Sequence, residues 1–165
     1  MYSFGNIEKP YYYCFEIIKR CVSINETKIN IIITDIIVND RFRYIPESFL
    51  RKVYGVILAY DITNRESFNN LEFWKNEVHN KSPNNIQFVV VGLKCELSEM
   101  RMITKGEGES FAAKYNIPFF EVSSDDYLNV ESPFIALTQL VLSTPKSQNL
   151  NHPLLNPRIE SNCMF

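Results

Sequence analysis

Apolar runs alternate with helical patterns through most of this chain, and this alternation constrains the fold more than any other feature. Residues 53–60 and 86–91 are nearly continuous apolar runs, the second interrupted only by Gln87. Such runs are typical of parallel strands that are covered on both faces. A shorter run at 117–122 predicts a further strand. Strands alternating with helices indicate an α/β protein with a mostly parallel sheet and helices on both faces.

Each predicted helix begins at a polar residue. Thr63 and Thr104 are each followed three residues later by Glu, the capping-box spacing that satisfies the free amides of a helix start. The apolar residues behind Thr63 form one stripe at helical spacing: Phe68, Leu71, Trp74 and Val78. Trp74 is therefore expected in the core rather than on a ligand platform. We expect Asn129 to cap a last helix, with Pro133 tolerated in its first turn.

The chain divides into three expected regions. Residues 1–13 form an N-terminal lead-in, residues 14–143 one α/β domain, and residues 144–165 a flexible polar tail. The domain opens with two β-branched segments at 14–24 and 29–34 around the turn-like residues Asn25, Glu26 and Thr27, which predicts a β-hairpin.

Composition excludes several classes of function. The net charge of −2 implies no general attraction to nucleic acid. No apolar run approaches the ~20 residues that span a bilayer, and the first ten residues carry no signal-peptide pattern. The four cysteines have no paired spacing, which indicates thiols in a reducing cytosol rather than disulfides or zinc ligands.

Residues 58–63 read Leu-Ala-Tyr-Asp-Ile-Thr and residues 41–43 read Arg-Phe-Arg. In order and spacing, these and further motifs between about residues 15 and 142 resemble those of the Rab family of Ras-superfamily small GTPases. Residues 92–97, Gly-Leu-Lys-Cys-Glu-Leu, resemble the family's base-specificity motif Gly-Asn-Lys-x-Asp-Leu. Residues 121–125, Glu-Val-Ser-Ser-Asp, stand where the family has Glu-Thr-Ser-Ala-Lys. The order and spacing of these motifs together carry the resemblance.

The resemblance implies the P-loop GTPase (Ras-like) fold and a role in intracellular vesicle trafficking. It implies GTP or GDP and Mg²⁺ as cofactors, and trafficking effectors or regulators as partners. It also implies a cytoplasmic protein that associates peripherally with endomembranes. The family hydrolyses GTP, so whether this chain is an enzyme depends on which site residues it keeps.

The base site is half kept. By resemblance, the stem of Lys94 would cover the guanine ring, and Glu96 replaces the aspartate that pairs with the base edge. Leu93 replaces an asparagine and forfeits its hydrogen bonds, while Ser123 and Ser124 can supply the loop's backbone amide. The alternative interpretation is a solvated strand-to-helix loop without a ligand.

The phosphate site is the largest departure from the family. No G-x-x-x-x-G-K-[ST] occurs in the 165 residues, and no threonine precedes Thr27 to stand for the switch I ligand of Mg²⁺. Gly-rich amides and a lysine are what hold nucleotide phosphates in that loop. We therefore expect a domain without its first strand, phosphate loop and first helix, or a sequence whose start is incomplete.

Switch II keeps only its aspartate. Asp35 stands at the Asp-x-x-Gly position and is either an Mg²⁺ partner or a strand-end aspartate with nothing to coordinate. Val38 replaces the glycine, and Asn39 replaces the glutamine that positions water. These changes predict impaired GTP binding and hydrolysis, and we assign no catalytic residue.

Cys163 is third from the end and single, whereas a prenylation box has its cysteine fourth from the end. It is either a lipid attachment site or an unmodified thiol. Three hypotheses remain for the whole chain: a Rab-like protein that scaffolds effectors without a nucleotide cycle, a working GTPase whose N-terminus is absent from this sequence, and a degenerate product.

Overall fold

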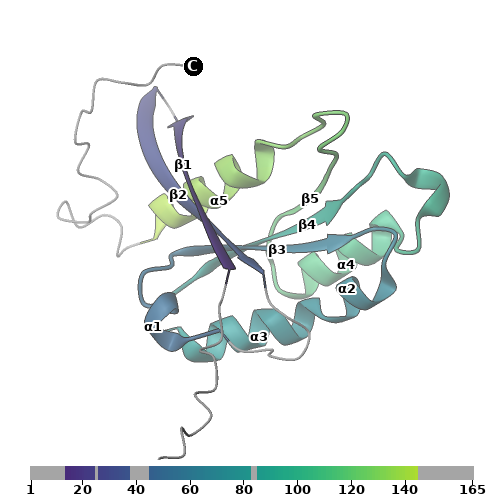
Figure 1. Ribbon diagram of the computed structural model, residues 1–165, viewed down its shortest axis with the longest axis horizontal. Helices are drawn as coiled ribbons and strands as arrows, with labels where there is room; N and C mark the ends of the chain where they lie inside the picture. Colours follow the sequence, from purple (N-terminus) through teal and green to yellow (C-terminus); the bar gives the residue numbers. More distant parts are fainter. Residues whose placement is uncertain (1–13, 25, 38–44, 83–84, 145–165) are drawn as a thin grey trace, which may run out of the picture.

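A computed structural model describes residues 14–24, 26–37, 45–82 and 85–144 (Figure 1). Its elements in chain order are β1 (Cys14–Ile24), β2 (Thr27–Ile37), α1 (Glu47–Leu50), β3 (Gly55–Asp61), α2 (Arg65–Asn69), α3 (Leu71–Lys81), β4 (Gln87–Leu93), a 3₁₀ turn (Ser98–Met100), α4 (Lys105–Lys114), β5 (Phe119–Val122) and α5 (Ser132–Ser143). None of the helices described is long and apolar enough to cross a membrane.

The predicted parallel sheet is confirmed, with strand order β3-β4-β5. Helices cover both faces: α5 lies on one side of the sheet and α2, α3 and α4 on the other (Figure 1). Alternate residues of the central strand point to the two layers. Val89 and Val91 pack against Leu137 of α5, whereas Val90 joins the larger core that includes Leu71 of α3.

The predicted hairpin is also confirmed, as a separate antiparallel sheet of β1 and β2 with Ile24 paired to Thr27. Glu26 in its turn has a φ of 66°, a left-handed conformation that tight hairpin turns require. Ile24 and Ile29 are buried, and β1 packs against α5.

The hairpin does not pair with β3, so β4 is the one neighbour of β3 among the described strands. Ala59, on the α5 side of β3, is exposed, whereas Leu58 and Tyr60 on the opposite side are buried. Among the described strands, β2 and β3 share no neighbour.

One predicted capping box is confirmed. Thr104 starts α4, where its hydroxyl accepts a hydrogen bond from the Glu107 amide at 3.2 Å. The Glu107 carboxylate in turn accepts from the Thr104 amide at 2.8 Å. The two groups satisfy amides that the helix itself cannot pair.

The capping box predicted at Thr63 is wrong. Asn64 caps α2 instead, and its side-chain oxygen accepts from the amides of Glu66 and Ser67 at 3.0 and 3.2 Å. The Thr63 hydroxyl is engaged elsewhere, because it donates to Asp61 Oδ1 at 2.7 Å. A nearby carboxylate thus outcompetes the helix for the threonine.

The cap predicted at Asn129 is wrong as well. Glu131 is the N-cap of α5, and Asn129 has a φ of 56° in the turn before it. Such a left-handed conformation is one that asparagine tolerates in turns. Pro133 does lie in the first turn of the helix, as predicted.

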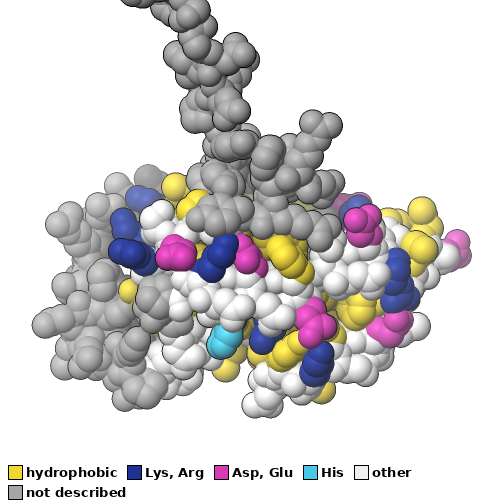
Figure 2. All heavy atoms as spheres, turned by 90° about the horizontal axis from the view of Figure 1, so that it is seen from below, with side chains coloured by type: hydrophobic (Ala, Val, Ile, Leu, Met, Phe, Trp, Pro, Cys, Tyr) yellow, Lys and Arg dark blue, Asp and Glu magenta, His cyan; other side chains and the backbone are white. Residues whose placement is uncertain are grey.

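The apolar stripe behind Thr63 packs as predicted but spans two helices, since the chain breaks between α2 and α3 at Asn70. Leu71 and Val78 are buried, and Phe68 and Trp74 are half-buried against the same core. Trp74 is therefore a core residue. The outer side of these helices carries acidic and basic side chains interspersed among apolar ones (Figure 2).

Candidate functional site

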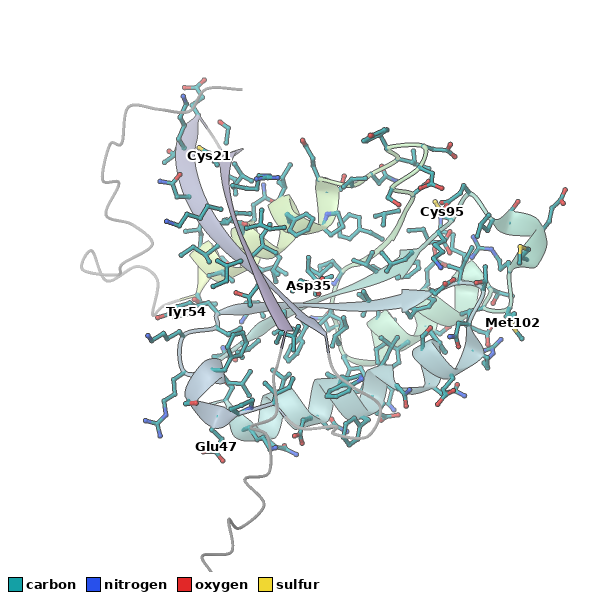
Figure 3. All side chains as sticks on the ribbon, in the orientation of Figure 1. Cys21, Asp35, Glu47, Tyr54, Cys95 and Met102 are labelled. Atoms are coloured by element: carbon teal, nitrogen blue, oxygen red, sulfur yellow. The ribbon has the colours of Figure 1, made fainter. Side chains whose placement is uncertain are left out.

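The three parallel strands end together at one edge of the sheet. Asp61 ends β3, Leu93 ends β4 and Val122 ends β5. The Ile62 amide donates to the Leu93 carbonyl at 3.1 Å, and the Cys95 amide donates to the Val122 carbonyl at 3.2 Å. The loops after the strands are therefore held side by side at the carboxyl edge, where open α/β sheets bind their ligands. Figure 3 labels Cys95 at this edge.

Lys94 spans two of these loops. Its φ of 64° is left-handed, and its ammonium Nζ lies 2.6 Å from Asp61 Oδ2. The hydrogen bond that the ammonium donates to this carboxylate raises the pKa of Lys94 above its ordinary value. The lysine side chain is still 52% exposed, so its methylenes stay accessible to a ligand.

Asp61 is the best-satisfied carboxylate of the site. Its second oxygen, Oδ1, accepts from the Thr63 amide at 2.8 Å and from the Thr63 hydroxyl at 2.7 Å. Partial burial raises the pKa of Asp61, but the hydrogen bonds from Lys94 and Thr63 outweigh it, so the pKa lies below its ordinary value. Asp61 is therefore ionised at neutral pH.

Glu96 is the opposite case. Its Oε2 is buried and has no hydrogen-bond partner among the described residues. Buried polar atoms are nearly always paired, so an orphaned carboxylate oxygen indicates a missing donor. A guanine base would supply such donors through its N1–H and exocyclic amine. The residues present thus fit the base of the nucleotide.

The two serines play different roles. Ser123 is fully buried; its amide donates to the Leu128 carbonyl at 3.1 Å, and its hydroxyl accepts from the Asp126 amide at 3.0 Å. Its amide is therefore engaged within the turn. Ser124 is exposed beside it, which makes it the better candidate to present a backbone amide to a ligand.

Sequence reasoning missed a second ion pair that supports this edge. The two terminal nitrogens of the Arg101 guanidinium donate to Glu121 of β5, at 2.5 and 3.0 Å, and one of them also donates to the Ile103 carbonyl. This ion pair between Arg101 and Glu121 joins the end of β5 to the loop before α4. Burial, followed by the charge of Glu121, raises the pKa of the enclosed Tyr60 hydroxyl to about 12.

Asp35 is not brought to this edge. It lies on β2 with an exposed side chain, well away from Cys95 in the view of Figure 3. Within the described segments no group of three His, Cys, Asp or Glu could hold a metal ion. Val38, Asn39, residues 41–43 and Cys163 lie outside the described residues. Of the candidate site residues that the structure describes, Asp35 is thus the one that lies apart from the edge where the strands end.

Comparison with known proteins identifies the family. Residues 8–143 match the model of the Ras family. The chain is 39% identical over 126 residues to the Ras-related protein RabT2 of Dictyostelium discoideum, covering 74% of this chain and 58% of that protein. It is 36% identical over 129 residues to the Ras-related protein RIC1 of Oryza sativa subsp. japonica, covering 78% of this chain and 64% of that protein. It is 31% identical over 141 residues to the Ras-related protein Rab-8 of Diplobatis ommata, covering 86% and 67%.

The chain therefore belongs to the Ras family of small GTPases, as a Rab-like member. The matches span 58% and 64% of the first two relatives, about three fifths of their length.

Proposed function

We propose that this chain is a Rab-like protein of intracellular vesicle trafficking that holds guanine nucleotide weakly, mainly by its base, with impaired GTP hydrolysis. The observation that carries the proposal is the buried Glu96 Oε2 without a partner, at the edge where β4 and β5 end. Ser124 adds a candidate backbone donor. The acceptor and the donor are complementary to the two sides of a guanine edge.

Weak rather than tight binding follows from three substitutions. Glu96 carries its carboxylate one methylene further out than the family's aspartate, which disturbs bidentate pairing with the base. Leu93 offers no side-chain hydrogen bond where the family has asparagine, and the residue is 37% exposed. Val38 adds a side chain where the family's glycine amide approaches the γ-phosphate.

Impaired hydrolysis follows from the same region of the sequence. Asn39 stands in place of the water-positioning glutamine and is one methylene shorter. Asp35 is the one Mg²⁺ ligand that the resemblance offers, and a single carboxylate without phosphate oxygens or further ligands is a poor magnesium site.

Partners and location are proposed from the family alone. We expect trafficking effectors or regulators to bind the chain, and we expect it in the cytoplasm and on endomembrane surfaces. Lipidation of Cys163 would serve such contact, although one prenyl chain without a polybasic flank anchors only marginally.

Nucleotide preference tests the proposal. Titration of GTP and ATP into the purified chain should show weak binding with GTP favoured. Glu96→Ala should remove this preference, because the acceptor is lost, whereas Glu96→Asp combined with Leu93→Asn should strengthen it. Glu99→Ala is the matched control, since it removes the same charge from an exposed residue of the neighbouring 3₁₀ turn. An unchanged preference in both Glu96 variants would mean that the base site is vestigial.

A second candidate is a GTP-hydrolysing Rab protein whose phosphate-binding residues lie outside these 165. The observation that favours it is the length of the relatives, of which the chain matches 58% and 64% in the first two. An in-frame coding stretch for Gly-x-x-x-x-Gly-Lys-Ser upstream of Met1 would select this candidate.

A further inference from the structure

The Lys94 side chain is fixed at both ends. Its backbone is held in a left-handed turn that the Leu97 amide closes by donating to the Lys94 carbonyl at 3.0 Å. Its ammonium is held at Asp61, on the neighbouring strand β3. The four methylenes between these points therefore lie along the carboxyl edge of the sheet, from the end of β4 to the end of β3.

Asp61, which holds the ammonium of this lysine, is itself immobilised. Thr63 donates two hydrogen bonds to Asp61 Oδ1, which leaves Oδ2 for the ammonium. The Asp61 amide donates to the Ser67 hydroxyl at 3.1 Å, which ties the end of β3 to the first turn of α2. A carboxylate held in this way cannot follow a mobile lysine. The lysine must instead adopt the position that the carboxylate sets.

We propose that Asp61, oriented by Thr63, is the positioning residue that lays the Lys94 stem across the sheet edge as a flat apolar platform for the guanine base. The inference rests on the proposed function, because it assigns a role within the same base site. A flexible lysine loses side-chain entropy when it is ordered. With Asp61 in place the lysine is ordered before the ligand arrives, so binding is stronger than it would be with a free lysine.

A plain surface ion pair is the competing explanation, and the molecule offers one for comparison. Lys114 Nζ lies 2.8 Å from Glu72 Oε1 between α4 and α3, with side chains 56% and 50% exposed. Asp61 differs in being only 20% exposed and in having its other oxygen fully engaged. Glu72→Gln is thus a matched control that removes a similar pair without touching the base site.

The test measures Lys94 and the ligand separately. NMR titration of lysines labelled at Cε reports the pKa of Lys94 in the absence of nucleotide, and calorimetry with GDP reports affinity. In Asp61→Asn the pKa of Lys94 should fall, because the hydrogen bond to Asp61 and the charge of Asp61, which both raise it, are lost. GDP affinity should fall about two- to tenfold, the range that ~0.4–1.4 kcal/mol of lost ordering gives.

The remaining variants locate the effect. Thr63→Val keeps the hydrogen bond from the backbone amide of residue 63 to Asp61 but removes the one from the hydroxyl. It should therefore change the Lys94 pKa and the GDP affinity by less than Asp61→Asn does. Glu72→Gln should leave both unchanged. An unshifted Lys94 pKa in Asp61→Asn, or an equal loss of GDP affinity in Glu72→Gln, would overturn the positioning role. If the unmodified chain shows no preference for GDP over ADP, the proposed function and the platform fail together, whereas the pKa measurement still decides whether Asp61 holds the lysine.

Discussion

Gly108 of α4 occupies a position where the structure leaves no room for a side chain. An added Cβ would lie 2.5 Å from the Tyr60 hydroxyl and 2.6 Å from the Phe119 ring. Tyr60 is 1% exposed and packs edge-on against Phe68 with ring centroids 5.0 Å apart, so it has little space to retreat. Gly106, two residues earlier in the same helix, has nothing within 4 Å of an added Cβ.

The two glycines allow the steric cost to be isolated. Overpacking a core costs about 1–3 kcal/mol, and replacing glycine by alanine within a helix returns up to about 1 kcal/mol. Gly106→Ala should therefore be neutral or slightly stabilising. Gly108→Ala should be less stable than Gly106→Ala by about 1–3 kcal/mol, because the helix-propensity gain is similar in both and the clash exists in one.

Urea denaturation followed by circular dichroism measures this difference. The comparison requires that the free energy of unfolding depend on urea concentration with the same slope in both variants. The site should respond too, since Tyr60 precedes Asp61 and a displaced Tyr60 shifts the anchor of Lys94. Equal stability of the two variants would refute the close packing of α4 on the Tyr60 and Phe119 side chains.

Three further predictions concern stability and its distribution. Thr104→Ala should lower the free energy of unfolding by about 1 kcal/mol, measured by urea denaturation, because it removes a helix cap; no loss would contradict the capping box. Hydrogen bonds from Arg65 and from Thr104 lower the pKa of Glu107 from its ordinary 4.5 to about 2. This carboxylate therefore contributes its full stability above about pH 4.5 and loses it as the pH falls towards 2, so Glu107→Gln should flatten the pH dependence in that interval, and an unchanged slope would count against the pairing. Amide exchange followed by mass spectrometry should be slowest in β4, the strand with neighbours on both sides, and faster in the β1–β2 hairpin; uniform strong protection would show that the strands pair more extensively than described.

Most of the fold follows from local patterns in the sequence. The apolar runs predicted the parallel strands because central strands are buried on both faces, although the edge strand β5 begins two residues later than the run at 117–122. The cap at Thr104 was predictable because the carboxylate nearest its hydroxyl is the capping Glu107 itself. The cap at Thr63 was not, because Asp61 competes for the same hydroxyl and Asn64 is an equally good cap.

The site was predictable only where the motifs carry it. The resemblance selected Lys94 and Glu96, and the structure brings both to the edge where the strands end. The link between Lys94 and Asp61 depends on two strands that pair in space, so no local pattern reveals it. Glu96 lacks a partner for one of its oxygens, and only the packing around the loop shows this.

Nucleotide titration with and without Mg²⁺ is the most direct test of the central claim that this Rab-like chain retains a base site without an effective phosphate site. Fluorescently labelled GTP, titrated into the purified chain, should bind more weakly than micromolar. Its affinity should change little when Mg²⁺ is added or chelated, because the base contributes most of the binding. Tight binding that requires Mg²⁺ would contradict the account.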